Sequence, residues 1–497
     1  MGCERKMALE FIAATGKLEE QNSDCIVASA FEGKLSPDAE RIDRLLNGEI
    51  SAAMKRKEFE GKSGSLMVLR TLGKLKARKV IILGLGKEKD YSKQIAESAA
   101  ATAFQAVKND CESIAFKVSH SDLPAVVGTS IICSYDFQEW KTVERKEQKL
   151  RKVSFVFQTQ DEANKATSAI GHARIVANAQ NYCRELNNSN PATATPAFIA
   201  EQAQKLDGGK IHVEVWGMEQ LKKKGYNAIV SVGKGSINEP KLIVMEYNGG
   251  KPGDKPYAIV GKGVCFDTGG LDLKPGKYMN FMQYDKSGAC AVIATIKAIK
   301  ELELPVNVVA IAPMVENMPS GGSYKPGDFI KTASGKTIEI TNTDAEGRVI
   351  LSDALYHATT LKPKGIIDLA TLTGACVVAL GTHAAGLMTN NAQFAEKVKS
   401  AAHESGERVW ELPMWREYED LVKSDVADVH NADESPDAGT IEGGWFLRSF
   451  VPDEIPWVHL DIAGTANVEH PTSMFRAGAT GWGVKLLTEF FKKQAGK

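Results

Sequence analysis

Short apolar runs of strand length alternate with helical stretches through the larger part of this chain. The runs that we interpret as strands are Lys210–Val215, Ala228–Val232, Lys241–Met245, Tyr257–Phe266, Val306–Met314, Gly365–Leu369 and Trp457–Ile462. Strands that alternate with helices form parallel or mixed sheets with helices on both faces. The pattern therefore predicts an α/β fold with a central mixed sheet covered by helices. In such sheets, ligands gather beyond the carboxyl ends of the strands.

A smaller α/β unit is predicted at the N-terminus, where Ser92–Val107 has a helical pattern. Its apolar runs are Asp24–Ala30, Ser65–Leu69, Val80–Leu85 and Val153–Phe157. A long helical pattern begins at Asp161 and stops at the Asn- and Pro-rich stretch 187–191. At 497 residues, the chain is long enough for more than one domain. We predict an N-terminal α/β domain over 1–165, a linker helix over 166–190 and a larger domain over 191–497.

Charge and cysteine usage narrow the classes of function. The chain has 61 Lys and Arg against 62 Asp and Glu, whereas proteins that bind nucleic acids or anionic membranes usually carry a basic excess. The span Gly365–Met388 lacks Lys and Arg but contains Asp368 and His383, which favours a buried strand and loop over a membrane helix. Eight scattered cysteines without a CxxC pair indicate reduced thiols in a cytoplasmic protein. We expect neither a membrane nor a nucleic-acid partner.

Four acidic residues fall at strand ends or helix starts inside apolar sequence; they are Asp267, Asp285, Asp344 and Glu346. Asp267 follows the strand Tyr257–Phe266, which Lys262 interrupts, and Asp285 precedes a helical pattern that starts at Ser287. A carboxylate at the start of a helix is favoured by the helix dipole. These positions predict that the acidic side chains meet at one end of the sheet.

Asp344 and Glu346 follow a predicted hairpin over Thr332–Ile340 and precede an amphipathic helical pattern. In an extended segment, side chains two residues apart point to the same side. We therefore expect the two carboxylates to face one edge together.

Buried together, four carboxylates would repel one another unless protons or cations neutralised them. Two divalent ions balance the four charges. Lys262 could bind a metal only as a neutral amine, with a pKa far below its usual value of about 10.4. Lys274 and Arg348 remain as cationic groups at the rim, suited to a developing oxyanion or a bound anion. Singly, an Asp-x-Glu in a loop is usually solvated and a strand lysine usually reaches to solvent, but the combination favours a two-metal site.

The nine histidines form no HExxH-like pair. We therefore predict structural roles for His357, His383 and His459.

Two motifs resemble the signatures of the leucyl aminopeptidase (cytosol aminopeptidase) family of two-metal exopeptidases. They are Val260-Gly-Lys-Gly-Val-Cys-Phe-Asp-Thr-Gly-Gly270 and Asn342-Thr-Asp-Ala-Glu-Gly-Arg348. The spacings from Lys262 to Arg348 also resemble the family pattern. The resemblance extends over roughly residues 175–490, and the N-terminal region resembles the family only in size and α/β pattern.

The resemblance implies a set of metal ligands. The ligands of the tighter ion would be Lys262, Asp267, Asp285 and Glu346, and those of the more exchangeable ion Asp267, Asp344 and Glu346. The tighter ion is expected to be Zn²⁺, with Mn²⁺, Mg²⁺ or Co²⁺ as alternatives at the exchangeable site.

The resemblance also implies catalytic and pocket residues. Lys274 would polarise the scissile carbonyl and stabilise the tetrahedral oxyanion, and Arg348 would hold a bicarbonate-like anion that acts as a general base. The residues that map to the substrate pocket are Met282, Thr371, Gly374, Ala463 and Ala466. The sequence departs from the family pattern at three positions, Lys286, Ser287 and Ala466, of which the last leaves the pocket roomier than in some members.

The implied function is that of a metal-dependent aminopeptidase. Such an enzyme releases N-terminal residues, preferentially leucine and other apolar residues, from peptides with a free N-terminus by attack of a metal-bridging water. Family members form hexamers, so a homohexamer is expected.

Two alternatives come from other classes of protein. Phe266-Asp-Thr-Gly269 also resembles an aspartic protease, but that mechanism needs a second Asp-Thr/Ser-Gly, and the sequence contains none. A binding or regulatory protein is the other alternative, because some family members also bind DNA, and a salt-dependent gel shift would distinguish it. A non-catalytic relative is expected to have lost a metal ligand, and none is lost here.

Overall fold

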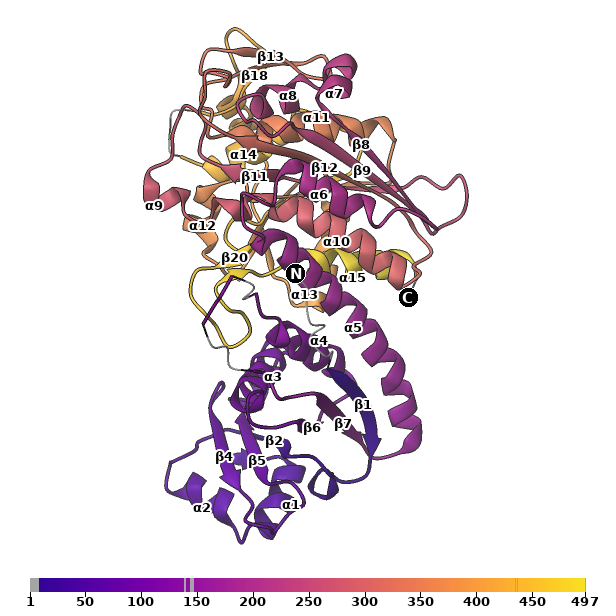
Figure 1. The fold of residues 1–497 in the computed structure, drawn as a ribbon, viewed down its shortest axis with the longest axis vertical. Helices are drawn as coiled ribbons and strands as arrows, with labels where there is room; N and C mark the ends of the chain where they lie inside the picture. The colour runs from indigo at the N-terminus through magenta and orange to yellow at the C-terminus, as the bar shows by residue number, and fades with distance from the viewer. Residues whose placement is uncertain (1–8, 138–139, 144–146, 434, 436, 497) are drawn as a thin grey trace. The chain divides into compact units, whose positions relative to one another are not determined.

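The computed structural model describes residues 9–137, 140–143, 147–433, 435 and 437–496 (Figure 1). Contacts divide the chain into unit 1 (Met1–Asn178 and His470–Arg476) and unit 2 (Ala179–Glu469 and Ala477–Lys497). The division falls inside the long helix α5 (Gln160–Asn188). The limits 1–165, 166–190 and 191–497 remain predictions.

Unit 1 is built on a seven-stranded sheet in the order β1-β7-β6-β2-β5-β4, with β3 beside β2. Its strands are β1 (Glu10–Thr15), β2 (Cys25–Phe31), β3 (Lys34–Leu35), β4 (Leu66–Arg70), β5 (Lys79–Gly84), β6 (Ser113–Lys117) and β7 (Lys152–Phe157). Its helices, besides the first part of α5, are α1 (Pro37–Leu45), α2 (Glu49–Lys55), α3 (Lys93–Val107) and α4 (Leu123–Ser134). Ile26 and Ile82 pack in a cluster with residues of α1 and α2, whereas Val27 and Ile81 pack with those of α3 and α4. The strands alternate their side chains between two helical layers.

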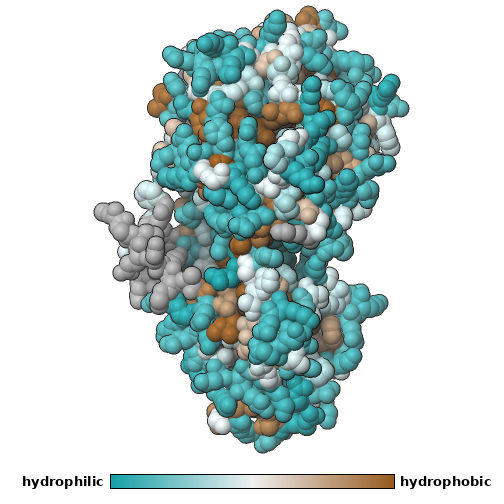
Figure 2. Space-filling model, turned by 90° about the vertical axis from the view of Figure 1, so that its right-hand side faces the viewer, coloured by the Kyte–Doolittle hydropathy of each residue, from teal (hydrophilic) through white to brown (hydrophobic). Residues whose placement is uncertain are grey.

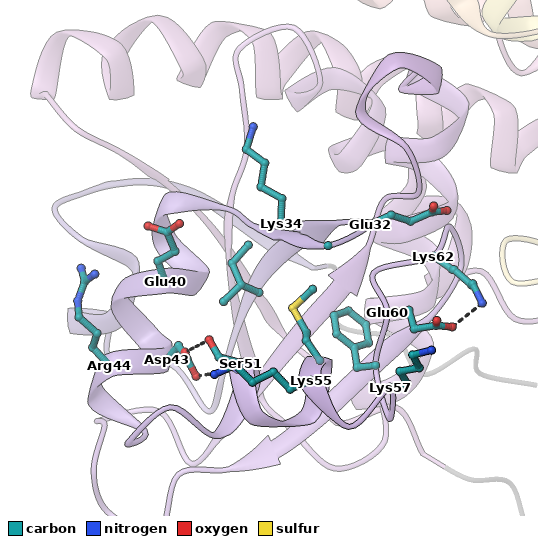
Figure 3. Close-up of a pocket in the computed structure, with 14 residues that line it drawn as sticks. Glu32, Lys34, Glu40, Asp43, Arg44, Ser51, Lys55, Lys57, Glu60 and Lys62 are labelled. Carbon is teal, nitrogen blue, oxygen red and sulfur yellow. Dashed lines mark hydrogen bonds and ion pairs between the residues drawn. The ribbon is translucent and has the colours of Figure 1, made fainter.

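One cavity of about 780 Å³ lies in unit 1 between α1, α2 and the segment around Phe59 (Figure 3). Figure 3 shows charged side chains of both signs around it, with Asp43 turned toward Ser51. Asp43 Oδ1 accepts hydrogen bonds from the backbone amides of Ile50 and Ser51 at 2.7 and 3.2 Å. The Asp43 carboxylate therefore stabilises the start of α2, and none of the predicted site residues lines this cavity.

Unit 2 contains a nine-stranded sheet in the order β17-β16-β19-β15-β10-β12-β9-β8, with β11 beside β12. Its strands are β8 (Ile211–Trp216), β9 (Lys241–Asn248), β10 (Tyr257–Gly261), β11 (Gly263–Asp267), β12 (Asn307–Asn317), β15 (Ile366–Ala370), β16 (Ala385–Thr389), β17 (Val409–Glu411) and β19 (Trp457–Asp461). Parallel and antiparallel pairs both occur, with β12 and β9 antiparallel. Helices α10 (Ser287–Glu301) and α11 (Glu346–Thr360) flank it on opposite sides (Figure 1). The predicted mixed sheet covered by helices is confirmed.

The remaining elements of unit 2 are shorter. The helices are α6 (Pro196–Gln204), α7 (Met218–Lys224), α8 (Asn227–Gly233), α9 (Gly276–Met279), α12 (Gly374–Leu380), α13 (Ala392–Ser405), α14 (Gly439–Arg448) and α15 (Val484–Gln494). The strands are β13 (Phe329–Lys331), β14 (Thr337–Glu339), β18 (Val429–His430), β20 (Asn467–Val468) and β21 (Gly478–Ala479). The antiparallel pair of β13 and β14 is the hairpin predicted over Thr332–Ile340, although its strands begin earlier.

One strand prediction is wrong, and another is confirmed with a break. Ala228–Val232 lies in helix α8, where Asp353 Oδ2 accepts hydrogen bonds from the amides of Ala228 and Ile229 at 2.9 and 3.2 Å. A short apolar run fits either structure, and this carboxylate stabilises the helical one at the N-terminus. Tyr257–Phe266 forms two strands, β10 and β11, with Lys262 between them.

The strands β10, β11, β12, β15 and β19 run parallel to one another through successive pairs. Their carboxyl ends therefore share one edge of the sheet. The residues at or just after these ends are Lys262, Asp267, Asn317, Thr371 and Asp461. This edge holds the candidate site.

The described surface and thiols are ordinary for a folded domain. Figure 2 shows one face that is mainly hydrophilic, with hydrophobic groups in limited areas. The seven described cysteines are all buried, and Cys3 lies outside the described residues. None of the described helices combines the length and apolar character that crossing a membrane requires.

Candidate metal centre

Lys262 joins three segments at the carboxyl edge of the sheet. Its Nζ lies 2.9 Å from Asp285 Oδ1 and 2.9 Å from Glu346 Oε1. It also donates a hydrogen bond to the carbonyl oxygen of Thr371 at 2.9 Å. The β10–β11 break places this lysine in a buried position between two predicted metal ligands.

Lys274 makes a second bridge between carboxylates. Its Nζ lies 2.8 Å from Asp267 Oδ2 and also pairs with Asp344 Oδ1. Oxygens of Asp267, Asp344 and Glu346 all lie within 4.8 Å of one another, close enough to share a metal ion. The structure thus brings together all four acidic residues and both lysines that the sequence singled out. We call Asp267, Asp285, Asp344 and Glu346 the carboxylate cluster.

Two glycines permit this close approach. Gly269 has φ +87°, and a Cβ there would lie 2.4 Å from the carbonyl oxygen of Asp272. A Cβ at Gly347 would lie 2.5 Å from Lys262 Nζ. Larger residues at these positions would displace the loop or the lysine.

Asp344 and Glu346 lie close together, but the backbone between them differs from the one predicted. The segment is not extended, because residues 343–344 form a turn and Glu346 is the first residue of α11. The Glu346 carboxylate therefore lies at a helix N-terminus, where the dipole favours negative charge. Asp285 has the predicted place, just before α10.

Asn317, which was not among the predicted site residues, lies opposite Asp267 at the end of β12. Its Nδ2 donates hydrogen bonds to Asp267 Oδ1 at 2.9 Å and to the carbonyl oxygen of Thr343 at 3.0 Å. Asn317 thus ties the first motif to the second. The available signal was its position at a strand end on the shared edge.

Burial and mutual repulsion raise the pKa values of three members of the carboxylate cluster. Burial, together with the nearby carboxylates of Asp267 and Glu346, raises the pKa of Asp344 to about 7. Burial also raises the pKa values of Asp285 and Glu346, despite the opposing effect of Lys262. The ionised cluster is therefore unfavourable without further positive charge.

The pKa values of the two lysines are raised as well, which for an amine favours the charged form. Burial lowers the pKa of Lys262, but Asp285 and Glu346 more than offset it, so the pKa lies above its ordinary value. Burial also lowers the pKa of Lys274, but the carboxylates of Asp267, Glu346 and Asp344 together outweigh it, so this pKa is likewise raised. Both are therefore described as ammonium groups, and a neutral Lys262 remains a prediction for the metal-bound protein.

The donor set of the cluster fits divalent cations. Two ammonium groups do not balance four carboxylates. Among the described residues, Asp285 Oδ2 and Glu346 Oε2 are buried and have no hydrogen-bond partner. Buried unpaired carboxylate oxygens are costly unless a cation binds them, so these atoms fit metal ligands.

Arg348 is not at the rim, contrary to our expectation. It is buried, and its Nη1 donates hydrogen bonds to Glu442 Oε1 at 2.5 Å and to the carbonyl oxygen of Asn431 at 2.7 Å. The position is inside the protein because α14 packs against α11 and supplies the carboxylate.

The predicted pocket residues follow the same edge of the sheet. Met282 begins the 3₁₀ helix Met282–Lys286, Thr371 follows β15, Gly374 begins α12, and Ala463 and Ala466 follow β19. Thr371 Oγ1 donates to Asp285 Oδ1 at 2.7 Å, which connects this group to the cluster. Ala466 is buried, and the substrate-binding role of all five remains a prediction.

Of the other residues that the sequence singled out, all but His383 form hydrogen bonds inside the protein. Lys286 is buried and donates to the carbonyl oxygens of Gln283 and Asn187 at 2.5 and 3.3 Å, and the Ser287 hydroxyl donates to Asn187 Oδ1 at 3.3 Å. His357 Nδ1 pairs with the Tyr226 hydroxyl, and His459 Nδ1 pairs with Asp368. His383 lies in an exposed segment.

Family models match both parts of the chain. Residues 181–488 match the catalytic domain of the cytosol aminopeptidase family, and residues 26–143 match the N-terminal domain of the same family. A probable cytosol aminopeptidase of Geobacter sp. (strain M21) is 40% identical over 482 residues, which cover 96% of this chain and 98% of the relative. A second, from Pseudomonas fluorescens (strain SBW25), is 39% identical over 98% of this chain and 100% of its own.

Solved structures show the same likeness. A mutant of tomato leucine aminopeptidase has a TM-score of 0.87 at 31% identity, covering 99% of this chain and 98% of its own. The bottromycin maturation enzyme BotP in complex with Mn has a TM-score of 0.83 at 29% identity, covering 95% of this chain and 99% of its own.

Proposed function

The chain belongs to the cytosol aminopeptidase family, as the two motifs predicted, and on that premise we propose that it releases N-terminal leucine and other apolar residues from peptides. Its family makes it a metal-dependent aminopeptidase, a hydrolase that acts on peptide bonds. The observation that carries metal-dependent hydrolysis is the carboxylate cluster, with its buried unpaired oxygens beside two lysines. The preference for apolar residues rests on the pocket residues that the family resemblance implies. We place the protein in the cytoplasm, following the names of its relatives.

Two groups of residues would hold the metal ions. We assign the tighter ion to Lys262, Asp267, Asp285 and Glu346, and the exchangeable ion to Asp267, Asp344 and Glu346. Zn²⁺ is proposed for the first, and Zn²⁺, Mn²⁺, Mg²⁺ or Co²⁺ for the second. When bound, such ions supply Lewis-acid activation of a water and an anchor for the substrate α-amine.

The protein's own groups would position the substrate. Lys274, mostly buried beside Asp267 and Asp344, would donate a hydrogen bond to the scissile carbonyl oxygen and stabilise the negative charge that develops there. Asn317 would keep Asp267 oriented through the hydrogen bond to its Oδ1. Because Arg348 already forms a buried ion pair with Glu442, the proposed mechanism includes no dissociable anion bound to Arg348.

Hydrolysis of a panel of aminoacyl amides tests the proposal. Free Leu and Met amides should be cleaved fastest and N-acetylated ones not at all, because a free α-amine fixes the register of the substrate. Dialysis against a chelator should abolish cleavage, and Zn²⁺, Mn²⁺ or Co²⁺ should restore it. Full activity in protein shown to be metal-free by elemental analysis would rule the proposal out.

The proposed pocket residues predict an order of preference among N-terminal residues. Burying a Leu or Met side chain is worth about 1.5–3 kcal/mol, whereas Gly gains nothing and Asp or Glu is desolvated without a partner. Phe should be tolerated, because Ala466 is smaller than the residue that some family members have at this position. Ala466→Met should therefore lower turnover of Phe amide more than that of Leu amide.

The Leu amide serves as the control for this variant, because it reports whether the buried substitution preserves the fold. An unchanged or higher Phe-to-Leu ratio of kcat/KM would show that Ala466 does not line the pocket.

We also propose a homohexamer, since family members assemble in this way and closed symmetry is typical of such enzymes. Sedimentation velocity should show one species with the mass of six chains. A stable and fully active monomer would contradict this expectation.

A further inference from the structure

Arg348 and Glu442 form a buried ion pair between α14 and α11, the helix that begins with Glu346 of the carboxylate cluster. The two side chains are 8% and 7% exposed, and Arg348 Nη1 lies 2.5 Å from Glu442 Oε1. Arg348 is two residues after Glu346 on α11, and Glu442 lies in the first turn of α14. The pair therefore joins two helices at the site.

Glu442 is held in place by more than the arginine. Its Oε1 also accepts a hydrogen bond from the backbone amide of Asp433 at 3.1 Å, and a carboxylate in the first turn of a helix is favoured by the dipole. Helix α14 also contacts the segment after β15 that contains the predicted pocket residues Thr371 and Gly374, because the Thr440 and Thr373 hydroxyls lie 3.2 Å apart. The carboxylate is thus a fixed anion rather than a mobile surface group.

A dissociable bicarbonate does not fit this arrangement as an obligatory partner of Arg348. The positive charge of the guanidinium is already matched by a buried carboxylate in contact with it. A second anion at the same guanidinium would lie close to the Glu442 carboxylate in a poorly solvated region, where like charges repel strongly. Removing one member of such a pair would leave the other buried and uncompensated.

We propose that Glu442 is a positioning residue that serves as the built-in anion of Arg348, so that this enzyme works without added bicarbonate. This inference rests on the proposed aminopeptidase function. Glu442 fixes the orientation and balances the charge of Arg348. Truncating the side chain at position 442 would leave the positive charge of Arg348 unpaired and would create space beside it for a small anion.

The test compares the wild type, Glu442→Ala and Glu442→Gln as metal-loaded proteins in CO₂-free buffer, with bicarbonate, formate or chloride added. Wild-type kcat for Leu amide should change less than about twofold with bicarbonate. Glu442→Ala should lose at least about tenfold in kcat and regain activity with bicarbonate or formate, but not with chloride at equal ionic strength. Glu442→Gln should be impaired and respond little, because its amide fills the space.

Anion binding provides a readout that does not depend on turnover. In isothermal titration calorimetry, bicarbonate should bind metal-loaded Glu442→Ala more tightly than the wild type. Metal content and thermal unfolding, measured on all three proteins, separate loss of the pair from loss of the fold.

Three results would overturn the inference: strong activation of the wild type by bicarbonate, full activity of Glu442→Ala without any anion, or a folded, metal-loaded Glu442→Ala that no anion restores or binds. If the wild type cleaves no aminoacyl amide with metals bound, the proposed function fails instead. The calorimetric comparison still tests the ion pair in that case.

Discussion

Replacing Glu346 by Gln should lower kcat/KM for Leu amide by more than about 10³-fold and reduce the bound metal below two ions per chain. Glu346 is fully buried; its Oε1 pairs with Lys262, and its Oε2 has no partner among the described residues. It is also the residue that we assign, with Asp267, to both ions. Gln keeps the shape but removes the charge, so both sites should weaken together. Elemental analysis and amide hydrolysis measure the two effects.

Glu316→Gln is the matched control for a buried glutamate. Glu316 lies on β12 next to Asn317, but its carboxylate accepts hydrogen bonds from Ser236 Oγ at 2.5 Å and Asn238 Nδ2 at 3.1 Å. This variant should retain both metals and its activity. If Glu346→Gln also retains both, Glu346 is not a metal ligand.

Glu346→Gln should lower the activity but should not lower the thermal stability of the metal-free protein. Because the pKa of Glu346 is raised in the folded state, the folded protein holds its proton more tightly than the unfolded chain does. The free energy of unfolding of the metal-free protein therefore falls as the pH rises from the pKa of Glu in the unfolded chain, about 4.3, through the higher pKa of Glu346 in the folded protein. Gln does not titrate, so the metal-free variant should unfold at the same or a higher temperature than the metal-free wild type at neutral pH.

The sheet and the cluster were accessible from the sequence because their signals are local. Alternating strand and helix patterns indicate a sheet, and acidic residues at strand ends and helix starts then fall on its carboxyl edge. The position of Asp267 could be predicted because this residue follows an apolar run of strand length. The ligand roles came from the family motifs, and their assignment remains a proposal.

The features that were missed depend on contacts between distant segments. Arg348 was expected at the rim because nothing near it in the sequence shows that Glu442 covers it. Ala228–Val232 is equally apolar as strand or helix, and the deciding carboxylate of Asp353 belongs to another element. Strands β1 and β6 in unit 1 are short and were not singled out, although pairing with β7 places both in the sheet.

Lys274→Ala should lower kcat by about 10²–10³-fold while both metals stay bound, as loss of an oxyanion donor does in other enzymes. The Lys274 ammonium pairs with Asp267 and Asp344, two of the proposed ligands of the exchangeable ion. Removing a positive charge beside these carboxylates makes them better ligands for a cation, so metal content should be unchanged or higher. The combination of low kcat and full metal content distinguishes transition-state stabilisation from a structural role.

Lys277→Ala is the matched control for this change, because Lys277 lies three residues further on in an exposed position and contacts only the ring of Tyr278 among the described interactions. That variant should keep wild-type kcat and metal content. Unchanged kcat in Lys274→Ala would remove this lysine from the mechanism. Loss of metal together with kcat would instead assign Lys274 to the stability of the site, because the drop in rate would then follow the missing ions rather than the missing hydrogen-bond donor.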